Sequence, residues 1–168
     1  RAPAKTQSAL LEAMQEGQVT IDGQTLALPE PFMVVATQNP VEQEGVYPLP
    51  EAQMDRFLLR IPIGYPDLDT ETRMLAAHHR SAARSTPLFC ADEIIRLRAA
   101  VGRVDVAPEI GRSIVELVRH TRESRHVFLG GSPRASLSLL KACKARAYIF
   151  GYDFVRPDDV RALASYVL

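Results

Sequence analysis

Apolar positions near the start of the chain repeat with the spacing of one helix face. Ala9, Leu10, Ala13 and Met14 fall at positions i, i+1, i+4 and i+5, and Gly17 follows where such a helix would end. This pattern predicts one amphipathic helix. The stretches 19–21 and 24–26 then flank Asp22-Gly23, a two-residue signal for a type I′ turn, and so predict a short β-hairpin.

Two later runs, Phe32–Thr37 and Phe57–Ile63, are apolar without polar alternation. This pattern is typical of strands that are covered on both faces, as in a parallel sheet. Such strands need partner strands and covering helices, so we expect further strands to precede Arg1. Because the chain begins with arginine rather than methionine, we also expect it to be a fragment.

Beyond Gly64-Tyr65-Pro66 the apolar residues take helical spacing. Three sets predict three helices of a bundle: Met74 and Leu75; Ile94, Leu97 and Val101; Ile110, Ile114, Leu117 and Val118. A fourth helix is predicted to start with Ser132 as N-cap and Pro133 at its first position. It is expected to bury Leu137, Leu140, Cys143 and Ala147, and a fifth helix from Pro157 is expected to carry Val160, Leu163 and Val167. The predicted fold class is α/β plus all-α, with a boundary near Pro66 between residues 1–66 and 67–168.

Composition narrows the class of protein. With 168 residues, of which 46% are hydrophobic, the chain can bury a core, and no apolar run approaches the ~20 residues of a membrane span. Two distant cysteines, Cys90 and Cys143, do not form a disulfide framework, so we expect a reducing compartment, the cytoplasm. The net charge is zero, but residues 1–66 hold four Lys/Arg and eight Asp/Glu, and residues 67–168 hold sixteen and twelve.

Three polar groups stand at the ends of predicted elements and suggest a phosphate site. Asn39 follows the first apolar strand, and its amide can hold a water against a phosphate; Asn before Pro is also a common turn initiator. Arg56 follows a short helical stretch, Pro50–Asp55. It could be an arginine finger, a cation that stabilises the charge developing on a transferred phosphoryl group. Alternatively, it could form a local ion pair with Asp55 or Glu51.

Arg134 occupies the second position of the fourth predicted helix. The macrodipole disfavours a cation there, but the free backbone N–H groups attract an anion, and a bound phosphate would satisfy both. The alternative is an arginine that bends into water or pairs with an acidic residue.

Other chemistries fit the sequence poorly. His78 and His79 are adjacent and cannot share a helix face as the H-E-x-x-H ligands do, so we expect no metal site. Ser132 lacks the G-x-S-x-G context of a hydrolase nucleophile. The basic residues Lys141, Lys144 and Arg146 form no recognised nucleic-acid reader and are read as a solvated helix face.

Taken together, these residues resemble the MoxR family of AAA+ ATPases. The resemblance is carried by residues 1–14, Pro29–Phe32, Ala36–Pro40, Glu42–Gly45, Tyr47–Arg60 and Gly131–Ala135. It implies the C-terminal part of a AAA+ P-loop NTPase core followed by a helical-bundle lid. Asn39 then looks like sensor 1, Arg56 like the arginine finger and Arg134 like the sensor 2 arginine of the lid. The hairpin around Asp22-Gly23 looks like the pre-sensor-1 insertion.

The resemblance also implies activity, cofactors and partners. It implies hydrolysis of ATP with Mg²⁺ at a subunit interface: Arg134 would bind phosphate within its own subunit, and Arg56 would reach the neighbour's γ-phosphate. It further implies a ring, expected to be a hexamer, and a chaperone-like role in maturing client proteins or inserting their cofactors. Partners with a von Willebrand factor A domain are also implied. No G-x-x-x-x-G-K-S/T motif occurs in the chain, and no apolar strand ends in an Asp-Glu pair. The main ligands of ATP and Mg²⁺ are therefore expected upstream of Arg1, and this chain alone should bind ATP poorly.

Two other classes of function stay open. The chain could be an interaction module that kept the fold and lost catalysis, or a nucleic-acid-dependent AAA+ motor, although its charge balance offers no basic stripe.

Overall fold

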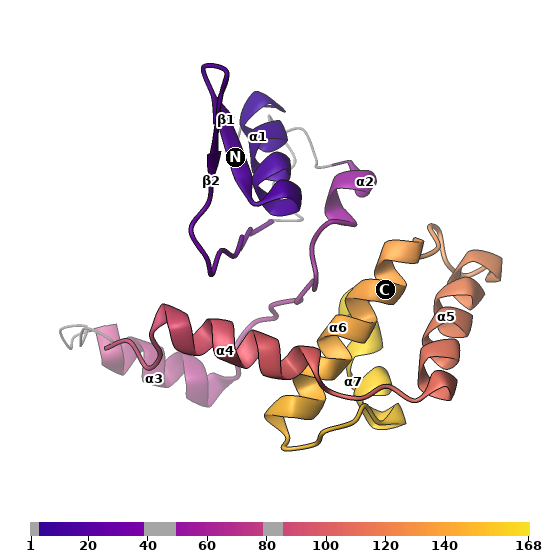
Figure 1. Cartoon of the computed structure of the whole chain (residues 1–168). Coiled ribbons are helices and arrows are strands. Elements are labelled where there is room, and N and C mark those ends of the chain that lie inside the picture. The colour runs from indigo at the N-terminus through magenta and orange to yellow at the C-terminus, as the bar shows by residue number, and fades with distance from the viewer. Residues whose placement is uncertain (1–3, 39–49, 79–85) are drawn as a thin grey trace.

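The computed structural model describes residues 4–38, 50–78 and 86–168. The elements, in chain order, are α1 (Ala4–Glu16), β1 (Gln18–Ile21), β2 (Gln24–Ala27), α2 (Glu51–Met54), α3 (Leu68–His78), α4 (Ala91–Gly102), α5 (Pro108–Glu123), α6 (Pro133–Ile149) and α7 (Pro157–Val167). Figure 1 shows α1 beside the hairpin, and α6 among α4, α5 and α7. Within the described ranges no helix is both long and apolar enough to cross a membrane.

The predicted first helix and hairpin are confirmed. Gly17, with φ of 62°, ends α1 in the left-handed conformation that glycine adopts at low cost. Asp22 and Gly23 have φ of 48° and 78°, the two positive values that a type I′ turn requires. The strands pair antiparallel, and the Thr20 hydroxyl donates to Glu12 on α1 at 2.7 Å, which ties the hairpin to the helix.

The two predicted core strands are not formed. Phe32–Thr37 and Phe57–Ile63 run without strand pairing, and the only sheet among the described residues is the β1–β2 hairpin. Met33 and Ile63 are 79% and 92% exposed. A strand needs a hydrogen-bonded neighbouring strand, and no described segment pairs with these runs as a strand. The apolar pattern was therefore misleading about strand formation within this chain.

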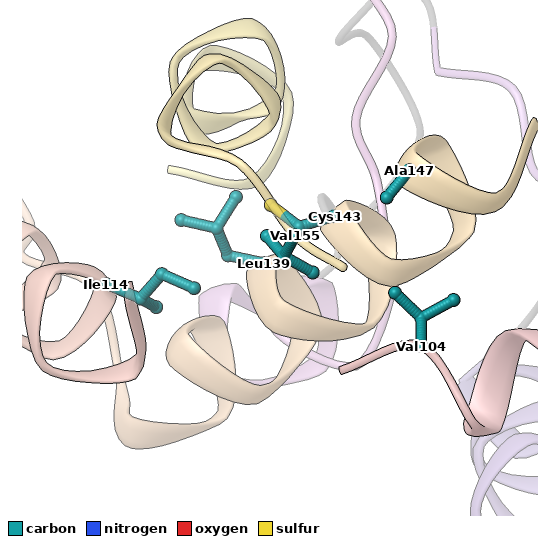
Figure 2. Packing of buried hydrophobic residues seen from close by; sticks show 6 residues of the cluster. All are labelled: Val104, Ile114, Leu139, Cys143, Ala147 and Val155. Atoms are coloured by element: carbon teal, nitrogen blue, oxygen red, sulfur yellow. The ribbon is translucent and has the colours of Figure 1, made fainter. Parts of the chain in front are cut away.

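The helical part packs around α6, which contacts α4, α5 and α7. Figure 2 shows Leu139, Cys143 and Ala147 along one face of α6, with Ile114 of α5 and the connecting residues Val104 and Val155 around them. Burial raises the pKa of the Cys143 thiol to about 11, so this side chain stays neutral and packs as an apolar group.

Two details of the predicted bundle are wrong. Leu137 is 59% exposed, because the buried face of α6 instead follows Ala135, Leu139 and Cys143, and Leu137 lies about 200° around the helix from Ala135. Met74 and Leu75 on α3 are 60% and 73% exposed, because no described element covers that face. The residues expected in the last helix, Val160, Leu163 and Val167, do pack against the core.

Candidate functional site

Of the three predicted site residues, the structure describes Arg56 and Arg134 but not Asn39. Asn39 falls outside the described residues, and the segment that leads to it, Phe32–Gln38, has no regular secondary structure. Arg56 and Arg134 are both described, and the residue before Arg56, Asp55, contacts Arg134.

Arg56 follows the short helix α2, as predicted. The turn after α2 is held by backbone hydrogen bonds from Arg56 N to Gln53 O at 3.3 Å and from Phe57 N to Met54 O at 3.0 Å. The side chain is half-buried, and its Nε is buried without a hydrogen-bond partner among the described atoms. In the part of the chain described, no ion pair joins Arg56 to Asp55 or Glu51, which were its expected local partners.

Arg134 stands in the first turn of α6, and the predicted cap is confirmed. The Ser132 hydroxyl accepts from the backbone N–H of Arg134 at 3.0 Å and of Ala135 at 3.4 Å, and Pro133 takes the first helical position. The Arg134 side chain remains 46% exposed. A cation is thus held beside the positive end of a helix, where an anion is favoured.

Asp55 supplies an anion at this position. The Ser132 hydroxyl donates to the Asp55 carboxylate, and its oxygen lies 2.7 Å from Oδ1 and 2.9 Å from Oδ2. Arg134 Nη1 lies 3.6 Å from Oδ2. The chain therefore brings together the residue before Arg56 and the start of α6, which are 77 positions apart. A second contact, from Arg60 N to Tyr166 O at 2.7 Å, attaches the same extended segment to α7.

Two glycines fix where α6 begins. Gly131 N–H donates to Thr121 Oγ1 at 2.8 Å, and Arg122 Nε donates to Gly131 O at 2.7 Å. A Cβ at Gly130 would lie 2.5 Å from the Arg122 Cα, so only glycine fits this approach to α5. The start of α6 is therefore set by α5 on one side and by Asp55 on the other.

This arrangement can bind a phosphate. It combines a half-exposed guanidinium, the positive end of a helix and a second arginine next in sequence to the carboxylate that Arg134 contacts. Sequence reasoning found the two arginines but missed Asp55 and the donor role of Ser132, because neither residue type signals a contact so distant along the chain.

Comparison with known proteins decides the family. Residues 1–59 match the family described as ATPase family associated with various cellular activities (AAA), and residues 119–168 match the AAA lid domain. A protein of Mycobacterium tuberculosis named Chaperone MoxR1 is 41% identical over 95% of this chain, which spans 45% of that protein. The chain belongs to the MoxR family of AAA+ ATPases.

Two further proteins are similar to this MoxR-family chain over its whole length. A Bacillus subtilis protein, YeaC, is 48% identical over the whole chain, which spans 53% of it. The chain thus covers about half the length of the curated relatives it matches. The crystal structure of a candidate ATPase from Cytophaga hutchinsonii superposes with a TM-score of 0.91 at 38% identity, covering all of this chain and 54% of that one. The MoxR-family chain therefore has the fold of the C-terminal part of a AAA+ core with its helical lid.

A separate ion cluster stabilises the lid of this MoxR-family chain. Asp159 on α7 is fully buried, accepts from Arg146 on α6 and from the backbone N–H of Arg156 at 2.9 Å, and lies 3.5 Å from Arg156 Nη2. Burial alone would raise the pKa of Asp159, but the hydrogen bonds from Arg156 and Arg146 outweigh it and the pKa is lowered. Arg146 also stacks on Phe150 and Arg156 on Tyr152, so this cluster joins α6 to α7. Among the described atoms, Arg156 Nε is buried without a hydrogen-bond partner.

Proposed function

We propose that this chain is the part of a Mg-ATP-hydrolysing enzyme that senses the bound nucleotide and triggers hydrolysis. One observation carries the proposal: Asp55, which directly precedes Arg56 in the chain, contacts Ser132 and Arg134 at the start of α6. In the reaction, water attacks the γ-phosphorus, the bond to the β–γ bridging oxygen breaks, and ADP and phosphate leave.

Each arginine would stabilise negative charge. Arg56 serves as the arginine finger, Arg134 as the sensor 2 arginine, and Asn39 as sensor 1, where its amide orients the attacking water. Arg134 would bind phosphate within its own subunit, and Arg56 would reach the γ-phosphate of the neighbouring subunit. The contact of Asp55 with Arg134, one residue before Arg56, supports a link between the two groups along the chain.

The cofactors would be held mainly by sequence upstream of Arg1. The chain contains no G-x-x-x-x-G-K-S/T loop, whose backbone N–H groups and lysine cradle the phosphates of ATP. The residues present do fit a phosphate, since a half-exposed guanidinium lies beside a helix start. We therefore expect Mg-ATP to bind weakly to these 168 residues alone.

The biological role we propose is that of a chaperone-like ring ATPase. A hexameric ring, proposed by family analogy, would place Arg56 at a subunit interface. The lid, residues 67–168, would rotate against residues 1–66 about the segment near Pro66. Support comes from the relative named Chaperone MoxR1. A client protein, a partner with a von Willebrand factor A domain and a cytoplasmic location complete the proposal.

The test is steady-state ATP turnover in the protein extended upstream through its phosphate-binding loop. Arg56→Ala and Arg134→Ala are each expected to lower kcat by about 10²-fold or more, because each removes a charge aimed at the transition state. Arg112→Ala, an equal truncation of an arginine that is 81% exposed on α5, should leave kcat within about twofold. Turnover that survives Arg56→Ala unchanged would remove Arg56 from the catalytic groups. No turnover in any form of the extended protein would favour a non-catalytic interaction module.

A further inference from the structure

The contact between Asp55 and the start of α6 suggests a role that the two arginines alone do not explain. We propose that Asp55 is the positioning residue of the phosphate site: it anchors α6 through Ser132 and keeps Arg134 oriented until a phosphate takes its place. This inference rests on the proposed phosphate-sensing function of Arg134.

The anchor is the bond with Ser132. One hydroxyl can donate once and accept twice, and Ser132 uses all of this capacity: it donates to the Asp55 carboxylate and accepts from Arg134 N and Ala135 N. Its oxygen lies 2.7 and 2.9 Å from the two carboxylate oxygens, in a half-buried setting. The end of α2 and the start of α6 therefore share one hydrogen-bonded junction, which fixes the place from which Arg134 extends.

The contact with Arg134 is looser. Arg134 Nη1 lies 3.6 Å from Asp55 Oδ2, beyond a good hydrogen bond, and its side chain is 46% exposed. Such a pair is weak in water. A phosphate offers more charge and several oxygens to the same guanidinium, so it can displace the carboxylate. Arg134 can then move to the ligand while Ser132 and α6 stay in place.

Asp55 is poorly suited to act as a base. Both of its oxygens face the Ser132 hydroxyl, and one of them also faces Arg134. These contacts favour an action through Arg134 rather than on the reacting atoms.

The experiment is a double-mutant cycle on ATP turnover in the protein extended through its phosphate-binding loop. Asp55→Asn, which keeps the shape and removes the charge, should lower kcat about tenfold, since a misplaced catalytic group loses rate steeply, with KM for ATP changed less. Arg134→Ala should lower kcat at least as much, and Asp55→Asn combined with Arg134→Ala should be no slower than Arg134→Ala alone. Asp55→Glu should recover part of the loss, and the exposed control Glu116→Gln should match the wild type.

An unchanged kcat in Asp55→Asn, or a double variant slowed by the product of the two single effects, would overturn the inference while leaving the role of Arg134 intact. Full turnover in Arg134→Ala would instead contradict the proposed function, and the inference would fall with it. If Asp55→Asn does not fold, Ser132→Gly removes the same junction, because glycine is tolerated as an N-cap. It should show the same non-additivity with Arg134→Ala, and additivity there would overturn the inference.

Discussion

At the scale of single residues, the lid depends on Asp159. This carboxylate has no solvent exposure, and its partners Arg146 and Arg156 are each 27% exposed. Removing one member of a buried ion pair leaves the other charges without compensation. The cost of breaking such a cluster exceeds the net value of forming it.

We therefore predict that Asp159→Asn lowers the free energy of unfolding by about 3 kcal/mol, the low end for a broken buried pair because the arginines keep some contact with water. The neighbouring Asp158, which is 70% exposed, provides the control. Asp158→Asn should cost less than about 1 kcal/mol. Urea unfolding followed by circular dichroism measures both, and equal losses in the two variants would contradict the special role of Asp159.

The same residue predicts a dependence of stability on pH. The pKa of Asp159 is lowered in the folded state, so the unfolded chain binds its proton first as the pH falls. The stabilisation is present above the ordinary carboxyl pKa of 3.8 and is lost as the pH drops further, through the folded pKa. Between pH 5 and pH 3 the urea midpoint should fall more in the wild type than in Asp159→Asn. Parallel falls would rule out this contribution.

At the scale of elements, the start of α6 is held by close backbone packing. A Cβ at Gly130 would meet the Arg122 Cα at 2.5 Å, and backbone atoms of α5 cannot move aside as a flexible side chain could. Gly111, inside α5, has open space where its Cβ would be. The two glycines therefore differ in what an alanine would do.

We predict that Gly130→Ala destabilises the protein by about 1–3 kcal/mol through overpacking. Gly111→Ala should stabilise it by about 0.5–1 kcal/mol, since alanine loses less conformational freedom in a helix. Thermal unfolding of both variants checks the opposite signs. A Gly130→Ala protein as stable as the wild type would show that α6 can start without this contact.

The elements also indicate what sequence patterns can predict. The hairpin and the helices follow from local rules, such as the positive φ values at Asp22-Gly23 and the cap at Ser132, and these predictions are confirmed. The strands Phe32–Thr37 and Phe57–Ile63 depend on hydrogen-bonding neighbours, which a local pattern does not supply. The exposure of Leu137 has a similar origin, because the face that α6 buries is chosen by α5 and α7.

At the scale of the whole molecule, the site arises from distant segments. The sequence identified Arg56 and Arg134 from their places at element ends, but the Asp55–Ser132 junction joins residues 77 positions apart and has no local signature. Met33 and Ile63 are exposed apolar side chains, and the chain spans about half the length of the curated relatives it matches.

The central claim is that this chain carries the trigger of an ATPase whose phosphate-binding loop lies elsewhere. The most direct test compares Mg-ATP turnover, under ring-forming conditions, by the 168-residue chain, by the protein extended upstream through that loop and by the extended Arg56→Ala variant. The account predicts turnover in the extended wild type alone. Turnover by the 168-residue chain itself, or none in the extended wild type, would contradict it.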